Sequence, residues 1–240
     1  PNQAEVFGYY FDGDAEVIGL PPGLGGDDAA TTDRLVERLA AREQMGNHAA
    51  YPVFALYWGE RERDPNRVVE RTLGRYAYHL DDSWYGDVRL TRYVLAGTRR
   101  AIDSDTRAAL TDGTDTILLS SASYHDGVEP GGFLLVELTW LNRREEPIGR
   151  RYKVFVQLLD AAGALIAQHD AEPAGNTLPT VDWPLGVGIT DRNALRLPPD
   201  LPSGQYTLIA GLYAADPPYA RLLLAEGSGD FITLARLNIE

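Results

Sequence analysis

The 240-residue sequence predicts a small α/β domain followed by an all-β domain. Stretches with helical and strand-like spacing alternate over residues 1–97, whereas short strand-like runs separated by Gly, Pro, Asn and Asp fill residues 116–240. Alternating strands and helices are typical of a parallel sheet covered by helices, and a series of short strands is typical of an antiparallel sandwich. We therefore predict a parallel α/β domain over residues 1–97, a polar connector over 98–115 and an immunoglobulin-like β-sandwich over 116–240.

Three stretches predict the strands of the first domain. Residues 15–20 form a short strand that stops at two prolines. Residues 53–58 are continuously apolar, which is typical of a strand buried on both faces. Residues 87–95 alternate apolar and polar side chains, as a strand with one buried face does. Helices between these strands imply that the strands run parallel.

Two helices are expected between these strands. Thr31 or Thr32 can cap the first helix, whose apolar residues continue at helical spacing to about Gln44. The second helix begins at Asp64-Pro65, because proline is favoured at the first helical position. Trp84-Tyr85 is expected to follow the end of this second helix.

Eight short runs predict the strands of the second domain. They are residues 116–124, 132–141, 151–159, 164–170, 188–197, 205–213, 220–226 and 231–239. Tyr206 lies just inside one of them, after a corner that contains Pro202 and Gly204. This is the position of the tyrosine corner of immunoglobulin-like sandwiches, so we expect a structural role in which the Tyr206 hydroxyl bonds to nearby backbone.

The composition excludes several functions. The net charge is −13, from 35 acidic and 22 basic residues, so nucleic acid is not expected as a partner. The absence of cysteine excludes disulfides, thiol catalysis and thiolate metal sites. No apolar run approaches the roughly 18 residues that a membrane-spanning helix needs, so we expect this chain to be soluble.

The motifs predict no catalytic residue, no metal site and no cofactor. Residues 23–26 are a glycine-rich loop between a strand and a helix, but the full phosphate-binding pattern is missing. Asp12-Gly13-Asp14 resembles the Asp-x-Asp of metal-dependent sugar transferases, although it is also an ordinary turn sequence. The histidines lack zinc-ligand spacing and are interpreted as loop-facing polar residues; they are His48, His79, His125 and His169.

One tryptophan is a candidate for ligand binding. Trp183 lies in a loop stiffened by Pro179 and Pro184, and an exposed indole there could stack on the C–H face of a sugar. Asp170 and Asp182 are the candidate acceptors for sugar hydroxyl groups. The alternative, which is favoured, is that Trp183 covers an edge of the core.

Several phrases of the sequence resemble a known family. In the second domain they are Tyr152–Asp160, Gly163–Asp170, Pro173–Gly175, Pro179–Trp183, Leu197–Tyr206 and Gly211–Tyr213, and in the first domain Tyr9–Phe11, Val17–Pro21, Val53–Trp58 and Trp84–Leu90. This pattern is similar to the C-terminal extracytoplasmic region of bacterial multi-pass glycosyltransferases of the protein-mannosyltransferase-like class. The phrases cover most of the chain but contain no catalytic motif.

The resemblance implies a parent protein that transfers a sugar from a lipid-phosphate donor outside the cytoplasm. In that class the catalytic carboxylates lie in loops near the first membrane helices, which this chain does not contain. The chain would then be a non-catalytic periplasmic or cell-surface portion, tethered through the membrane portion of the parent protein. Its expected partners are that membrane portion and an acceptor glycan or polypeptide.

Two other functions remain open. The first is a free-standing carbohydrate-binding β-sandwich with an α/β partner domain. The second is a hydrolase that uses the α/β domain, which would require a nucleophile and a base in one pocket. Apolar segments of about 20 residues upstream of Pro1 would favour the transferase, whereas a signal peptide would favour the binding protein.

Overall fold

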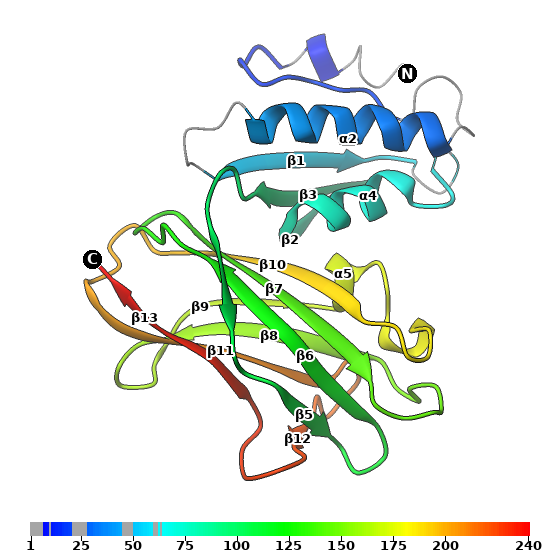
Figure 1. Cartoon of the computed structure of the whole chain (residues 1–240). Coiled ribbons are helices and arrows are strands. Elements are labelled where there is room, and N and C mark those ends of the chain that lie inside the picture. The colour runs from blue at the N-terminus through cyan, green and yellow to red at the C-terminus, as the bar shows by residue number, and fades with distance from the viewer. Residues whose placement is uncertain (1–6, 10, 21–27, 45–49, 60–61, 63) are drawn as a thin grey trace.

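The computed structural model describes residues 7–9, 11–20, 28–44, 50–59, 62 and 64–240. The chain is rich in β-structure and forms two sheets, with helices at one end of the larger sheet (Figure 1). Among the described residues, no helix combines the length and the apolar character needed to cross a membrane.

The elements follow one another along the chain in two groups. The first half, residues 1–97, contains α2 (Asp28–Gln44), β1 (Tyr51–Tyr57), α4 (Val68–Tyr76), β2 (Tyr78–Tyr85) and β3 (Val88–Leu95). The second half, residues 98–240, contains strands β4 (Ala101–Ser104), β5 (Ala108–Thr111), β6 (Thr116–His125), β7 (Phe133–Asn142), β8 (Tyr152–Leu159), β9 (Leu165–Ala171), β10 (Ile189–Arg196), β11 (Gly204–Ala214), β12 (Leu223–Leu224) and β13 (Ile232–Ile239). Two single turns, α5 (Pro173–Asn176) and η1 (Thr180–Asp182), lie between β9 and β10.

The two halves share the larger sheet. Its nine strands run in the order β1-β3-β2-β10-β7-β6-β5-β12, and β4 also pairs with β6. The smaller sheet has the order β13-β11-β8-β9. The link between the halves is a parallel pairing of β2 with β10, in register at His79 and Asn193 (Figure 1). The division of the chain into two domains stays a prediction, because the backbone of one sheet continues through both.

The prediction of a parallel sheet in the first half is wrong. β3 pairs antiparallel with both β1 and β2. Residues 78–85, which we expected to end a helix, form β2, and a tight turn at Gly86 joins β2 to β3. A turn of two residues can connect only antiparallel strands. The two strands expected to run parallel on either side of α4, residues 53–58 and 87–95, correspond to β1 and β3, which pair antiparallel, whereas β1 and the unexpected strand β2 run in the same direction with β3 between them.

The first half also departs from the expected elements elsewhere. Residues 15–20 are not a strand. β1 is a strand at the end of the sheet, and Phe54, Leu56 and Trp58 are 57%, 52% and 46% exposed, so the run is not buried on both faces. A continuous apolar run cannot by itself distinguish a buried strand from an edge strand with an apolar outer face.

The helices of the first half begin at positions that differ from the expected caps. α2 starts at Asp28, and Thr32 lies inside it with its hydroxyl donating to the Asp28 carbonyl at 2.8 Å. α4 starts at Val68, but Asp64 still supplies the cap, because its carboxylate accepts hydrogen bonds from the Val68 and Val69 amides at 2.7 and 3.0 Å. These bonds satisfy N–H groups that have no partner within the helix.

The strands of the second half are largely confirmed. Seven of the eight expected runs match β6 to β11 and β13 within one or two residues at each end. The run over residues 220–226 contains only the two-residue strand β12. The connector over residues 98–115 is not simply a polar link, because it contains β4 and β5, which both pair with β6. The alternation of apolar and polar side chains could be recognised in these strands because each strand buries one face against a common core.

Three hydrophobic clusters hold the described elements together. The larger core lies between the two sheets of the second half and includes Trp140, Tyr152 and Leu208. The smaller core lies between the helices and the first three strands, where Leu35 and Leu73 pack against strand residues that include Tyr93. The helices therefore cover one face of β1, β3 and β2. On the opposite face, Tyr78 and Val94 pack with Leu135 and Ala194 in the third cluster, whereas Phe54 and Leu56 are exposed.

Tyr206 has the predicted structural role. Its side chain is buried, and its hydroxyl donates a hydrogen bond of 2.5 Å to the carbonyl of Pro202, four residues upstream. The bond ties the start of β11 to the corner that precedes it, which is the geometry of a tyrosine corner.

We predict that Tyr206→Phe lowers the free energy of unfolding by about 1 kcal/mol, and by up to ~3 kcal/mol if the Pro202 carbonyl is left without a partner. Denaturant unfolding of both proteins measures the change. Tyr219→Phe is the control, because Tyr219 is 56% exposed. An unchanged midpoint for Tyr206→Phe would mean that the corner bond does not contribute to stability.

We predict that residues 98–240 expressed alone give a dispersed amide NMR spectrum, because both sheets around the larger core are then complete apart from the edge left by β2. A fragment of residues 113–240 should be less stable, since it loses β4 and β5 and exposes one edge of β6. Equal denaturant midpoints for the two fragments would show that β4 and β5 do not contribute to the fold.

Candidate functional site

A group of buried polar side chains lies where β2 meets β10. We call it the polar junction; its members are His79 and Asp82 of β2, His169 of β9, Asn176 of α5, and Asp191 and Asn193 of β10. His79, His169, Asp191 and Asn193 are each less than 5% exposed. The junction therefore joins three strands and one turn that belong to both halves of the chain.

A β-bulge places His79 and Asp82 on the same face of β2. The register with β3 shifts between His79 and Asp81, so Leu80 has no partner of its own. In a regular strand, residues three positions apart point to opposite faces, and one extra residue reverses this relation. The Nε2 atom of His79 consequently lies 3.2 Å from Oδ2 of Asp82.

The two histidines form a hydrogen-bonded pair between the halves. The Nδ1 atom of His79 lies 2.8 Å from Nε2 of His169, and the ring planes are nearly perpendicular. If His79 donates from Nε2 to Asp82, its Nδ1 must accept the proton of His169 Nε2–H. The chain Asp82–His79–His169 is thus ordered by the carboxylate at one end.

Asp82 is also held by three other side chains. Its Oδ1 atom accepts from the Thr91 hydroxyl at 2.6 Å, and its Oδ2 atom accepts from the Asn176 amide at 3.1 Å. The Arg89 guanidinium lies 3.8 Å from Oδ1. Arg89 in turn donates to buried Glu70 of α4 at 2.6 Å, so an ion-pair network continues from the junction to the helical layer.

Asp191 has only neutral hydrogen-bond partners. Its two oxygens accept from the backbone amide of Ala174 at 2.9 Å and from the side-chain amide of Asn193 at 3.0 Å. Among the described residues, no arginine or lysine forms an ion pair with this carboxylate. Asp191 and Asp82 therefore lie in the same junction in different electrostatic surroundings.

The turn that covers the junction has an unusual backbone. Ala174, Gly175 and Asn176 all have left-handed φ values, 54°, 61° and 66°. Consecutive left-handed residues are costly for side chains with a Cβ, so the surrounding contacts must hold the turn. The turn is fastened by the bonds from Ala174 to Asp191 and from Asn176 to Asp82, and Gly175 packs directly on the His79 ring.

Burial and local charge shift the pKa values in the junction. Burial acts to raise the pKa of Asp82, but the hydrogen bonds from His79 and Thr91 and the charge of Arg89 lower it to about 2. Burial lowers the pKa of His169 to about 3, and the neighbouring His79 adds to this effect. Burial raises the pKa of Asp191 to about 6, although Asn193 and the Ala174 amide favour the charged form. Near neutral pH the junction therefore contains a neutral His169 and a charged Asp82, which lie on either side of the His79 ring.

This arrangement favours a structural role over catalysis. A carboxylate followed by two imidazoles can relay a proton, but the rings are 3% and 4% exposed, so a substrate cannot reach them. Among the described residues, no group of three or more His, Cys, Asp or Glu side chains could hold a metal ion. The polar junction is best described as a hydrogen-bonded network that fixes β2 against β10 and α5, in which the buried Nδ1 atom of His169 has no well-formed hydrogen bond among the described residues.

A shallow pocket lies on the opposite face of the same strand pair. It has a volume of about 290 Å³ and is lined by residues from both halves, including Tyr78, His125, Glu137 and Arg192. The Tyr78 hydroxyl lies 2.7 Å from Nε2 of His125, and Nδ1 of that ring lies 3.2 Å from the Arg99 carbonyl. Burial lowers the pKa of His125. Arg192 is paired with Glu137 at 2.7 Å.

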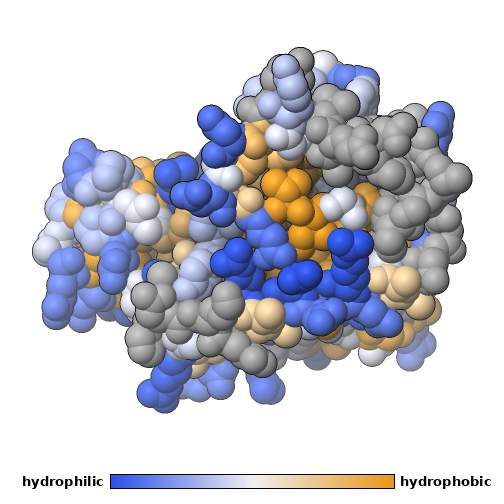
Figure 2. All heavy atoms as spheres, turned by 90° about the horizontal axis from the view of Figure 1, so that it is seen from above, coloured by the Kyte–Doolittle hydropathy of each residue, from blue (hydrophilic) through white to orange (hydrophobic). Residues whose placement is uncertain are grey.

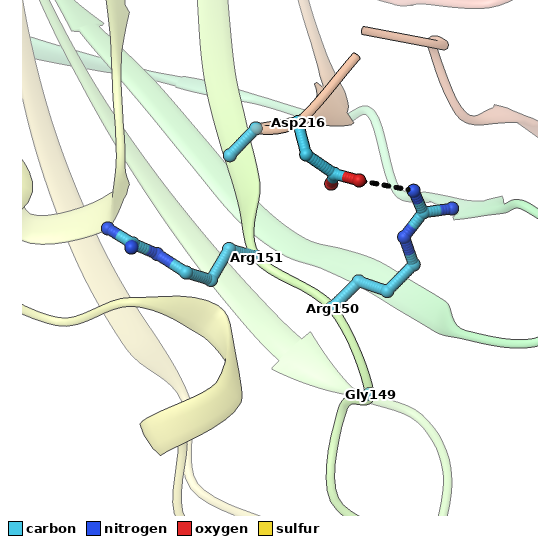
Figure 3. Close-up of a pocket in the computed structure, with 5 residues that line it drawn as sticks. Gly149, Arg150, Arg151 and Asp216 are labelled. Atoms are coloured by element: carbon cyan, nitrogen blue, oxygen red, sulfur yellow. Dashed lines mark hydrogen bonds and ion pairs between the residues drawn. The ribbon is translucent and has the colours of Figure 1, made fainter. Parts of the chain in front are cut away.

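A second pocket, of about 360 Å³, lies at the far end of the second half beside β8 and β11. Arg150 and Arg151 line it and extend in opposite directions (Figure 3). Arg150 is paired with Asp216 at 3.0 Å, and Arg151 forms a two-pronged pair with Glu172. Both guanidinium groups are therefore already engaged with carboxylates of the chain.

The expectation of an exposed indole at residue 183 is wrong. Trp183 is 4% exposed and belongs to the larger core. Its indole N–H donates to the Leu178 carbonyl at 3.1 Å, so the loop folds the ring inward and satisfies its polar atom. The alternative interpretation, in which Trp183 covers the core, describes the structure.

The two carboxylates predicted beside Trp183 face solvent. Asp170 lies on the outward face of β9, where partial desolvation raises its pKa against a hydrogen bond from Tyr213. Asp182 lies exposed in η1. Among the described residues, no hydrogen bond joins either carboxylate to the indole. Glycan binding at Asp170 and Asp182 stays a prediction. The Trp183 ring is buried and offers no stacking surface for it.

The remaining sequence candidates have separate outcomes. The glycine-rich loop at residues 23–26 and His48 lie outside the described residues. Asp12 and Asp14 are exposed and form no metal cluster with other described residues. The interpretation of His79, His125 and His169 as loop-facing residues is wrong, because all three lie buried in strands.

One signal in the sequence could have revealed the buried histidine of β9. In a strand over residues 164–170, the inward positions are small: Ala167 and Ala171 flank His169 on the same face. Small residues on either side leave room for an imidazole within the core. His79 carried no such signal, because the bulge at Leu80 interrupts the alternation of β2.

Comparison with known proteins adds no assignment: no family model matches the chain, and no curated protein matches its sequence.

We predict that Gly175→Ala destabilises the protein more than Gly163→Ala does. Both glycines have positive φ, 61° and 83°, so each alanine is strained by about 1 kcal/mol. A Cβ at residue 175 would also lie 3.2 Å from the His79 ring, whereas nothing lies within 4 Å of one at residue 163. Denaturant unfolding measures the difference; equal losses would mean that the turn moves away from His79 without cost.

Proposed function

We propose that this chain is the non-catalytic extracytoplasmic portion of a membrane glycosyltransferase of the protein-mannosyltransferase-like class. The resemblance of its sequence phrases to that region supports this proposal. So does the state of its buried titratable groups, which hydrogen-bond to one another and are closed to substrate. We infer that the chain serves as an accessory domain, tethered outside the cytoplasm, and that chemistry takes place elsewhere in the parent protein.

The observation that carries the proposal is an exposed apolar face at the end of the larger sheet. We call it the outer face of β1–β3; its most exposed members are Phe54, Leu56, Trp58 and Tyr85, which are 46–63% exposed. Leu56 is opposite Leu90, and Tyr85 is opposite Val88, so apolar side chains pair between neighbouring strands. The ion pair of Arg92 with Asp81 lies on the same face. The helices cover only the other side.

An exposed apolar area of this kind indicates a contact surface. Seen from above, the upper part of the molecule has a hydrophobic area bordered by strongly hydrophilic side chains (Figure 2). β1 and α2 lie in this part of the molecule (Figure 1). In the proposed function, the outer face of β1–β3 contacts the membrane portion of the parent protein.

We also infer an immunoglobulin-like arrangement for the second half. The tyrosine corner at Tyr206 and the common core between the two sheets support it. The three strands of the first half are an addition to such a sandwich, because β2, β3 and β1 extend the larger sheet beyond β10.

A carbohydrate-binding protein is the second candidate, and one observation favours it. Trp84 and Tyr85 are 64% and 63% exposed at the tip of the β2–β3 hairpin, and Trp58 lies beside them with its indole N–H bonded to Asp87 at 2.7 Å. Exposed aromatic rings next to a carboxylate suit the apolar face and the hydroxyl groups of a sugar. The sugar would then bind at the first half and not at Trp183.

We predict that the coding sequence upstream of Pro1 contains repeated apolar segments of about 20 residues. In the full-length protein, a photoreactive amino acid at position 56 should cross-link to those segments, whereas one at Leu223 should not. Leu223 is the matched control, since it is 59% exposed but lies in the second half. A signal peptide upstream of Pro1, with no membrane segment, would contradict the transferase.

We predict that the purified chain neither transfers nor hydrolyses sugar, since its paired imidazoles are closed to solvent. Titration with oligosaccharides, followed by tryptophan fluorescence, separates the two candidates. A signal that is lost in Trp84→Ala and kept in Trp183→Phe would favour the binding protein. Turnover that a point mutation within the chain abolishes would contradict both.

A further inference from the structure

β1 forms one end of the larger sheet, and among the described residues no strand pairs with its outer edge. The strand Tyr51–Tyr57 contains no charged side chain, and its ladder to β3 has no bulge. Charged residues, bulges and prolines are the usual means of keeping an exposed edge from pairing with another strand. Apart from Pro52 near its start, β1 lacks these features.

The register of the first three strands shows which backbone groups of β1 point away from the sheet. The two-residue turn between β2 and β3 makes Tyr85 and Val88 a hydrogen-bonded pair, and such pairs alternate along antiparallel strands. Every second residue of β3, counted from Val88, therefore bonds to β2, and the residues between them bond to β1. Phe54 and Leu56 lie opposite residues that bond to β2, so their own N–H and C=O groups point outward.

These outward backbone groups are available for pairing. In the part of the chain that the structure describes, no backbone hydrogen bond outside the β1–β3 ladder involves Phe54 or Leu56. Pro52 has the same orientation, which fits its chemistry, because proline is tolerated in an edge strand where the N–H would face away from the neighbouring strand. Phe54 and Leu56 together offer two donors and two acceptors to a further strand.

A second segment with a strand-like sequence also lacks a partner. The sequence predicts a strand over residues 15–20, but no described strand pairs with this segment. Figure 1 shows the segment on the side of α2 away from β1. Glu16 holds it there through ion pairs with Arg38 and Arg42 of α2, and Leu20 packs against the smaller core.

One additional strand along the edge of β1 would explain both observations. It would lie between β1 and residues 15–20 in the order that Figure 1 shows, and it could pair with each of them. Apolar side chains of both segments are exposed, including Val17 at 47% and Leu56 at 52%. Figure 2 shows the molecule from above, the direction in which this edge points, and an apolar area bordered by hydrophilic side chains lies there.

The surroundings of the edge favour a single strand over the sheet of a second copy. Two copies that paired through β1 would each bring α2 and residues 15–20 to the shared edge. These elements lie beyond β1 in Figure 1, so those of one copy would meet those of the other. A single extended segment does not bring such elements with it.

We propose that the edge of β1 binds one further strand, supplied by the segment that precedes Pro1 in the parent protein. The inference rests on the proposed function, because a longer parent protein must provide the segment. The helical turn at residues 7–9 lies in the same part of the molecule as this edge (Figure 1), so a preceding segment can reach the edge. A segment of the same polypeptide also has a high effective concentration at its site.

The position of the strand predicts its composition. It would have a neighbouring strand segment on each side and α2 over one face, so we expect a run of about five mainly apolar and β-branched residues. The outer face of β1–β3 would continue onto this strand beside Phe54 and Leu56.

Amide hydrogen exchange tests the proposal in two proteins. One is the chain of residues 1–240, and the other is the same chain extended upstream as far as the first membrane segment, or to the natural start if there is none. We expect the Phe54 and Leu56 amides to exchange at least about tenfold more slowly in the extended protein, because each gains a hydrogen bond. The Ala55 amide already points to β3 and is the matched control, so its exchange should not change.

Each outcome of this measurement decides a separate question. Equal exchange of Phe54 and Leu56 in the two proteins would overturn the proposal. Protection in the chain alone that increases with its concentration would assign the edge to a second copy, which also overturns it. Protection in an extended protein whose gene encodes no membrane segment would support the added strand and contradict the transferase, so the two proposals can fail separately.

Two variants give a second measurement. Leu56→Ala and Leu56→Pro both remove the apolar side chain, but only the proline removes the outward N–H group. The difference between their melting temperatures should therefore be larger in the extended protein than in the chain. An equal difference in both proteins would contradict the added strand, and the exchange measurement on wild type stands even if Leu56→Pro does not fold.

Discussion

The pairing of β2 with β10 is the contact on which the rest of the structure depends. Without it the larger sheet would be divided, and the helical layer would belong to a separate three-stranded unit. Only His79 and Asn193 are in register there, so the ladder itself contributes little. The side chains of the polar junction, from β2, β9, β10 and the turn at α5, supply further interactions on one face of this pairing. On the other face, Tyr78 and Val94 pack with Leu135 and Ala194.

A contact made by buried polar groups fixes one strand alignment, because other alignments leave buried polar groups without hydrogen-bond partners. Shifting β2 by one residue along β10 would separate His79 from His169 and leave both rings buried without a partner. An apolar joint of the same size would tolerate several alignments, since hydrophobic contacts are not directional. The left-handed turn at Ala174–Asn176 adds to this requirement, because its backbone conformation persists only while Asp82 and Asp191 hold it.

The sequence predicted the second half better than the first for a physical reason. Strands such as β7 and β8 bury one face against a common core, so their side chains alternate and their limits can be read directly. β2 lacks this alternation, because Leu80 is inserted as a bulge and the strand carries polar residues on its buried side. The wrong parallel sheet followed from that one misassigned element.

For the candidate site, the outcome depended on whether the contacts of a residue are local in the sequence. Tyr206 was predictable because a corner tyrosine is defined by its local sequence, and its hydroxyl bonds only four residues away. Whether the Trp183 ring is buried depended on the Leu178 carbonyl and on core residues distant in the sequence, which the local sequence cannot specify. His79 and His169 are 90 residues apart, and neither has a motif of its own. Sites assembled from long-range contacts between common residue types leave no local pattern to detect.

The first half buries several charged and polar side chains beside its apolar core and exposes several apolar ones. Charged and polar side chains such as Glu70, Arg89 and His79 lie inside, while Phe54, Leu56 and Trp58 face outward. The buried charges are tolerable because each is paired, as the 2.6 Å bond between Arg89 and Glu70 illustrates. The exposed apolar face has no such compensation within the described residues, and in the proposed function it is covered by contact with another surface. The inward polar network and the outward apolar face thus have different roles in the proposed function: the first fixes how the halves are joined, and the second is the surface we propose for contact with the parent protein.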